Sequence, residues 1–223
     1  MTAHLARIIF LGILAIALAT GLARAQEEYP PPQGMGRLVV VASGAMGMPH
    51  YSGMAKQIAL LGYDVVLVDG NAMEGTQGAG LKTAIEAAVH MPHAIHGKIA
   101  LVGFSLGGGI DLFYGIGRPD VIAGLVVWYP ATSLIHDPAA WADRLQVPVL
   151  MFAGEQDNYK GCCLIDTAHK LAEAAHAAGK PFELITYPRT DHDFIPGNRN
   201  YNPDSFNDAL QRTAARLKQY FGP

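Results

Sequence analysis

A serine, a histidine and a carboxylate each follow an apolar segment of this 223-residue chain, and these residue types together can carry out acyl transfer. Ser105 lies in the pattern Gly103-x-Ser105-x-Gly107, between an apolar run at 97–102 and apolar residues at helical spacing from Ile110 onward. The pattern is typical of a sharp strand-to-helix turn that lifts a serine hydroxyl clear of a sheet. We expect the two glycines to let this turn close where a Cβ would not fit.

A serine hydroxyl is a poor nucleophile unless a base lies within hydrogen-bonding reach and a third group orients that base. Among the nine histidines, His192 is placed best for a base, because it follows the last apolar run of the chain. Asp157 follows the preceding apolar run, and we favour it as the orienting acid over Glu155 and Asp166. The order Ser105, Asp157, His192 is the nucleophile, acid, base order of one large class of hydrolases.

Acyl transfer also needs donors for the oxygen that becomes negatively charged in the transition state. We expect the backbone N–H of Leu106, directly after the serine, to supply one donor. For the second donor we favour the backbone N–H of Ala45, in the glycine-rich turn after the apolar run at 38–42. Gly44 and Met46 in the same turn remain alternatives.

The elements that position these residues alternate between apolar runs and helical patterns. Short apolar runs typical of buried parallel strands lie at 38–42, 65–68, 97–102, 121–128, 147–152 and 182–187. Apolar residues at helical spacing separate them, and Asn202-Pro203 is expected to begin a closing helix. The alternation predicts an α/β protein with a single, mostly parallel sheet and helices on both faces. The connection between Trp128 and Val147 is too short for a large lid domain.

Composition describes a globular chain, with 50% hydrophobic and 16% charged residues, and the formal net charge of −3 does not favour nucleic acid as a partner. Residues 1–25 resemble a secretory signal peptide, because Arg7 precedes an apolar stretch that small residues follow. A retained membrane anchor is the alternative. We therefore predict a tether at 26–36, a folded domain at 37–223, and a secreted or periplasmic location without membrane contact after cleavage.

Two groups of residues carry weaker indications. Cys162 and Cys163 are adjacent, and we expect two free or partly buried thiols, with a vicinal disulfide as the alternative. Three histidines recur at every third position, namely His90, His93 and His96. A proline interrupts their segment and no nearby cysteine or carboxylate completes a ligand set, so we expect surface residues and no metal site.

The chain resembles the dienelactone hydrolase family of the α/β-hydrolase fold. The resemblance rests on Gly103-Phe104-Ser105-Leu106-Gly107-Gly108, on Ala153-Gly154-x-x-Asp157 and on Tyr187-x-x-x-x-His192-x-Phe194, and it covers nearly all of 37–223. It implies an α/β-hydrolase domain with a triad of Ser105, Asp157 and His192. Namesake members use cysteine at the position of Ser105, so the chain is more similar to the serine esterases of the family.

The sequence thus predicts a cofactor-free serine hydrolase that cleaves a small-molecule carboxylic ester or lactone through an acyl-enzyme. Thioester or peptide hydrolysis by the same triad is one alternative, and an inert binding protein of the same fold is another. Met46, Tyr129 and Trp141 are candidates to line the pocket because they lie near strand ends. Arg189 and Arg199 are expected to be plain surface charges, with contact to a substrate carboxylate as the alternative.

Overall fold

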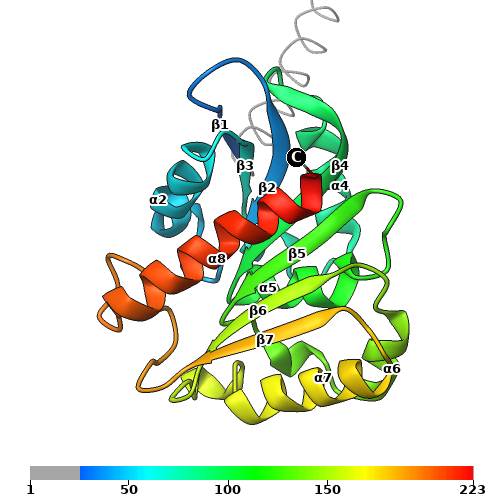
Figure 1. Cartoon of the computed structure of the whole chain (residues 1–223), viewed down its shortest axis with the longest axis vertical. Helices are drawn as coiled ribbons and strands as arrows, with labels where there is room; N and C mark the ends of the chain where they lie inside the picture. The colour runs from blue at the N-terminus through cyan, green and yellow to red at the C-terminus, as the bar shows by residue number, and fades with distance from the viewer. Residues whose placement is uncertain (1–25, 223) are drawn as a thin grey trace, which may run out of the picture.

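Seven strands form one sheet in the computed structural model, which describes residues 26–222 (Figure 1). The strands are β1 (Gln26–Tyr29), β2 (Gly36–Ala42), β3 (Asp64–Val68), β4 (Ala94–Phe104), β5 (Ile122–Trp128), β6 (Val149–Gly154) and β7 (Phe182–Tyr187). Their order across the sheet is β1-β3-β2-β4-β5-β6-β7, and β1 alone runs antiparallel to its neighbour. The predicted α/β-hydrolase fold with a mostly parallel sheet is confirmed.

Helices cover both faces of this sheet. They are α2 (Met48–Ala59), α3 (Gly70–Met73), α4 (Ala79–Ala88), α5 (Leu106–Ile110), α6 (Pro138–Arg144), α7 (Ile165–Ala177) and α8 (Pro203–Phe221). Side chains of α2 and α8 share one buried cluster with the sheet, while those of α3 to α7 share the other. In β2, Val40 faces one cluster and Val39 and Val41 face the other, so both faces of the strand are apolar.

The predicted tether at 26–36 is wrong in its first part, since Gln26–Tyr29 forms β1 and pairs with β3. Glu28 lies opposite Val66, and Tyr29 is buried against the same face as α2. Little in the sequence indicates this strand, because three of its four residues are polar. Its pairing is specified by the backbone groups that β3 would otherwise leave free at the sheet edge.

The connections between strands and helices are short. After β3, the Asp69 carboxylate caps α3 by accepting from the N–H of Asn71 at 3.0 Å. The predicted start of α8 is confirmed, with the Asn202 side chain accepting from the N–H of Ser205. Between β5 and β6 lie only the 3₁₀ helix η2 (Thr132–Leu134) and α6, so the expectation of no large lid domain is confirmed.

The closing helix α8 runs diagonally across the middle of the sheet (Figure 1). Near its end, the Tyr220 hydroxyl donates to the carbonyl of Leu125 at 2.8 Å, which fastens the helix to β5. The predicted signal peptide at 1–25 lies outside the described residues. Within 26–222, no helix has both the length and the apolar character that a membrane crossing requires.

Candidate active site

Ser105 occupies the turn between β4 and α5 that its sequence pattern predicts. Its φ of +47° lies in a region that L-residues rarely adopt. A Cβ at Gly103 would lie 2.5 Å from the Cα of Gly108, and one at Gly107 would lie 2.5 Å from the carbonyl oxygen of Ala42. Both glycines are therefore needed for close packing of the turn against strand and helix.

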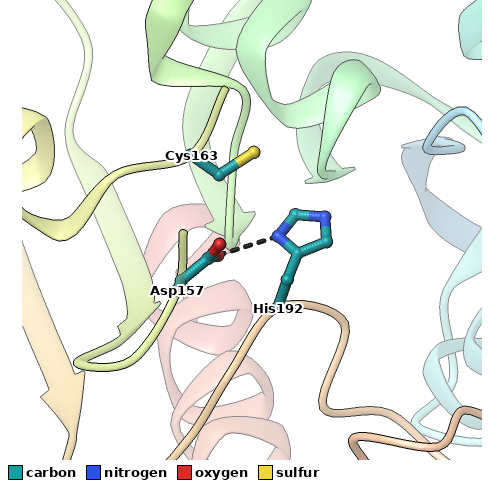
Figure 2. A group of neighbouring side chains, drawn as sticks. All are labelled: Asp157, Cys163 and His192. Carbon is teal, nitrogen blue, oxygen red and sulfur yellow. Dashed lines mark hydrogen bonds and ion pairs between the residues drawn. The ribbon is translucent and has the colours of Figure 1, made fainter. Parts of the chain in front are cut away.

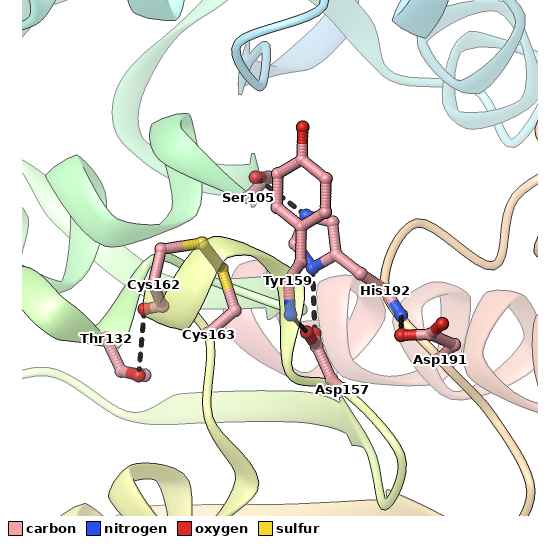
Figure 3. Close-up of a disulfide and its surroundings, with 8 residues drawn as sticks. All are labelled: Ser105, Thr132, Asp157, Tyr159, Cys162, Cys163, Asp191 and His192. Atoms are coloured by element: carbon pink, nitrogen blue, oxygen red, sulfur yellow. Dashed lines mark hydrogen bonds and ion pairs between the residues drawn. A yellow bond between two sulfur atoms is a disulfide. The ribbon is translucent and has the colours of Figure 1, made fainter.

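The three predicted site residues lie together at the carboxyl ends of β4, β6 and β7. His192 Nδ1 lies 2.8 Å from Asp157 Oδ2 (Figure 2), and His192 Nε2 lies 3.0 Å from Ser105 Oγ (Figure 3). All three residues are buried, with Ser105 the most exposed at 7%. This chain of contacts would let Nε2 take the serine proton while Asp157 holds the ring and compensates its charge.

Of the three carboxylates weighed from the sequence, Asp157 is the one that contacts His192. Its second oxygen, Oδ1, accepts from the backbone N–H of Tyr159 at 3.1 Å, so both carboxylate oxygens have fixed partners (Figure 3). Glu155 and Asp166 are exposed. The carboxylate favoured from the sequence is therefore the one that the fold brings to the histidine.

Two tyrosines that sequence reasoning did not assign to this role hold the imidazole of His192. The Tyr159 ring stacks nearly parallel on it, with a centroid separation of 4.6 Å and an interplanar angle of 4° (Figure 3). Tyr129 meets it edge to face at 4.9 Å. The main chain of His192 is also fixed, since its N–H donates to Asp191 Oδ1 and its carbonyl accepts from Asn200 Nδ2. The ring thus has little freedom to leave the serine.

A second polar cluster surrounds Asp193, directly after the histidine. Its carboxylate accepts from the Tyr129 hydroxyl at 3.0 Å and from Asn198 Nδ2 at 2.6 Å, and it lies 2.9 Å from His50 Nε2. Burial, followed by the charges of Tyr51 and Asp193, raises the pKa of Tyr129, which keeps its hydroxyl protonated as a donor. This cluster ties the loop after β7 to the start of α2.

The predicted oxyanion donors lie beside the serine. The N–H of Leu106 belongs to the first turn of α5, where helix geometry provides no intrahelical acceptor. Ala45 lines the same pocket as Ser105, as does its alternative Met46. A Cβ at Gly44 would lie 3.0 Å from Ser105 Cβ, so the whole turn after β2 approaches the serine closely. The assignment of Ala45 stays a prediction.

A cavity of about 460 Å³ opens over Ser105 and His192. Its wall is formed by Ala45, Met46, His50, Tyr51, Tyr159, Asp193 and 197–200. Met46 lines the pocket as expected, and Arg199 also belongs to its wall, whereas Arg189 lies exposed elsewhere. The expectation for Trp141 is wrong, because its ring is buried against Phe182 of β7 and its Nε1 donates to the carbonyl of Leu112. Tyr129 is likewise buried behind His192 and does not line the cavity.

Cys162 and Cys163 form a vicinal disulfide, so the expectation of two thiols is wrong (Figure 3). The turn η3 (Tyr159–Gly161) precedes them, and the Cys162 carbonyl accepts from the N–H of Ser133 at 2.8 Å and from Thr132 Oγ1. The disulfide constrains the backbone at 162–163, directly after the turn that carries Tyr159. Cys163 lies near Asp157 and His192 (Figure 2), but its sulfur is used in the disulfide and the other two side chains bind each other. This set does not fit a metal ion.

One buried carboxyl lies directly behind the serine turn without a role in it. Asp111 begins the π-helical turn η1 (Asp111–Gly115) that continues α5, and it is fully buried. Neither of its carboxyl oxygens has a hydrogen-bond partner among the described residues. Burial raises the pKa of Asp111 well above its usual range, so we expect the neutral acid here.

This sheet order, with a serine turn after the central strand and a histidine after the last, defines an α/β-hydrolase-fold protein. A family model described as "Dienelactone hydrolase family" matches residues 70–221. The chain belongs to the dienelactone hydrolase family, and its class is that of the carboxylic ester hydrolases. The resemblance drawn from the sequence motifs is confirmed.

Relatives and solved structures agree with this assignment. A Methylorubrum extorquens protein named carboxymethylenebutenolidase is 25% identical over 94% of this chain and 81% of its own length. A structure named as a dienelactone hydrolase from Klebsiella pneumoniae has a TM-score of 0.75 at 23% identity, covering 87% of this chain and 92% of that one. An esterase from Pyrobaculum calidifontis has a TM-score of 0.69 at 20% identity, covering 87% and 80%. At these identities the solved structures are evidence for the fold.

Proposed function

We propose that this protein is a serine esterase that cleaves small carboxylic esters or lactones through an acyl-enzyme. The observation that carries the proposal is the continuous contact from Ser105 Oγ through both ring nitrogens of His192 to Asp157, at 3.0 and 2.8 Å, beneath an open pocket. A serine whose proton has an acceptor in place can attack an acyl carbon. Family membership supplies the substrate class.

In the first half of the proposed reaction, Ser105 Oγ bonds to the carbonyl carbon while its proton passes to His192 Nε2. The carbonyl oxygen gains the negative charge, which the N–H groups of Leu106 and Ala45 stabilise. When the tetrahedral species collapses, the bond to the leaving oxygen breaks and Nε2 returns the proton to that oxygen. The alcohol departs, or in a lactone stays attached to the acyl group as a free hydroxyl.

In the second half, His192 takes a proton from water as the water oxygen attacks the acyl-enzyme. Collapse of this second tetrahedral species breaks the bond to Ser105 Oγ, which recovers the proton from Nε2. The carboxylic acid leaves and the free enzyme is restored. No step requires an oxidant, a reductant or a group that these residues do not provide.

Hydrolysis of a p-nitrophenyl acyl series from acetate to decanoate tests the proposal, with wild type and Ser105→Ala compared side by side. We expect hydrolysis by the wild type that the variant lacks, and covalent labelling of the wild type alone by a fluorophosphonate probe. A preference for short chains is expected from a cavity of about 460 Å³. Absence of both hydrolysis and labelling would favour the binding-protein alternative.

We propose in addition that the chain is exported and cleaved before Gln26. The Cys162–Cys163 disulfide supports this, because disulfides persist in oxidising compartments. Cell fractionation with N-terminal sequencing tests it: mature protein beginning at Gln26 outside the cytoplasm is expected, and full-length protein confined to the cytoplasm would contradict it.

A further inference from the structure

Three side chains that are far apart in the sequence meet at the end of the sheet opposite Ser105. Glu28 comes from β1, Asp64 is the first residue of β3, and His93 directly precedes β4. His93 Nδ1 lies 3.0 Å from Glu28 Oε1, and one donor atom from each of the three residues lies within 4.8 Å of the other two. Two carboxylates and an imidazole therefore converge on one point.

Asp64 gives this cluster its unusual character. The residue is fully buried, and neither carboxyl oxygen has a hydrogen-bond partner among residues 26–222. Buried carboxyl groups are normally paired, because removing one from water without a partner is costly. Burial, and next the charge of Glu28, raise the pKa of Asp64 to about 6, while His93 opposes the shift. A ligand with positive charge would satisfy both carboxylates at once.

The backbone between these residues holds them in place. Gly36 N–H donates to the His93 carbonyl at 2.9 Å, and a Cβ at Gly36 would lie 2.5 Å from the backbone nitrogen of Asp64. Only a glycine at this point lets the His93 segment and the start of β3 approach so closely. The convergence is thus built into the sheet rather than produced by free surface side chains.

We propose that Glu28, Asp64 and His93 bind a divalent transition-metal ion, with zinc as the best match. Zinc combines imidazole nitrogen with carboxylate oxygen at about 2.0–2.2 Å, whereas calcium and magnesium favour sets made only of oxygen. Donors around one zinc ion lie roughly 3–4 Å apart at these bond lengths, so small side-chain shifts would complete the site. A water molecule would supply the fourth ligand.

Access and function of the site follow from its place in the fold. Asp64 forms the buried floor, while the side chains of Glu28 and His93 are 19% and 43% exposed and leave an entry for the ion. The ion would join the edge strand β1 to β3 and to the segment before β4. Its role is therefore structural, and it lies at the opposite end of the sheet from the proposed serine chemistry.

Zinc titration of chelator-treated, tag-free protein tests the proposal, using isothermal calorimetry and thermal denaturation. We expect one zinc ion per chain and a higher melting temperature with zinc. Glu28→Gln and His93→Gln are each expected to weaken binding by at least about tenfold and to remove the thermal shift. The matched control is His96→Gln, because His96 is exposed three residues further along and contributes no donor atom to the cluster.

Asp64→Asn is a third variant. Because it changes a buried side chain and can alter folding itself, the variants of the two partly exposed ligands, Glu28 and His93, decide the outcome. The rates of ester hydrolysis by zinc-free and zinc-loaded protein should agree within twofold. Zinc bound at His192 would change the rate, so this comparison distinguishes the two locations. The proposal is overturned if the wild type binds no zinc. It is also overturned if Glu28→Gln and His93→Gln bind as tightly as the wild type, or if His96→Gln loses binding to the same degree.

Discussion

Replacement of Asp157 by asparagine is the most informative change to the proposed triad, because it keeps the shape of the side chain while an NH₂ group replaces one carboxylate oxygen. Oδ1 of Asp157 accepts from the Tyr159 N–H, so in the variant the amide oxygen would take that place and the NH₂ group would face His192 Nδ1. Nδ1 must then be the unprotonated nitrogen. The ring proton moves to Nε2, which can donate to Ser105 but cannot accept its proton.

The expected loss is large. In serine hydrolases, forcing the wrong tautomer in this way lowers kcat about 10⁴-fold. That ratio corresponds to about 5.5 kcal/mol of lost transition-state stabilisation. The 2.8 Å contact and the burial of Asp157 leave no room for water to replace the carboxylate, so we expect the full effect on kcat/KM. Stability should change little, because the asparagine keeps the volume and one hydrogen bond.

The assay is the initial rate of p-nitrophenyl acetate hydrolysis between pH 5 and 9, together with the rate of fluorophosphonate labelling. Glu155→Gln is the matched control, since Glu155 precedes Asp157 by two residues in the same turn and is exposed. We expect the control to retain wild-type rates. Activity of Asp157→Asn within tenfold of the wild type, or an equal loss in the control, would refute the assignment of the acid.

Three further predictions concern stability and the disulfide. Because the pKa of Asp111 is raised in the folded chain, the folded chain holds a proton that the unfolded chain releases above about pH 4. The free energy of unfolding should therefore fall by up to about 1.4 kcal/mol per pH unit as the pH rises. In denaturant melts from pH 4.5 to 8, Asp111→Asn should become more stable relative to the wild type. Gly124→Ala should cost about 1–3 kcal/mol in the same melts, because a Cβ there would overlap the Tyr220 ring; an unchanged midpoint would contradict this packing. Replacing Cys162 and Cys163 with serine should lower kcat/KM several-fold with KM less affected, because it frees the backbone directly after the turn whose tyrosine stacks on the imidazole. Equal kinetics with and without the disulfide would exclude that role.

The parallel strands were predictable from the sequence because each is buried on both faces and therefore apolar along most of its length. β3 and β5 show this most clearly, with Asp64–Val68 buried throughout and Ile122–Trp128 nearly so. The three residues that meet at the site were also predictable, because the carboxyl ends of parallel strands lie at one edge. The geometry of Ser105, His192 and Asp157 follows from that rule and from the glycines around the serine.

Features that depend on contacts between distant segments were not predictable in this way. β1 is specified by the edge of β3 rather than by its own residues. The two carboxylates near His93 come from β1 and β3, so the histidine looked isolated in the sequence. Tyr159 follows Asp157 by two residues, but its stacking on His192 depends on the turn conformation. Trp141 packs into the buried cluster between the sheet and α3 to α7 rather than into the pocket, and its position in the sequence does not reveal this.

The diagonal course of α8 has a consequence for how the chain reaches its final state. Phe206, Ala209 and Leu217 of this helix complete the buried layer that also contains Trp128. α8 follows all seven strands along the chain, so during synthesis the central strands exist before this part of their cover does. The apolar surface that α8 covers is therefore exposed until the helix has been made and has docked. We expect helper proteins that bind extended apolar segments to have their opportunity in that interval.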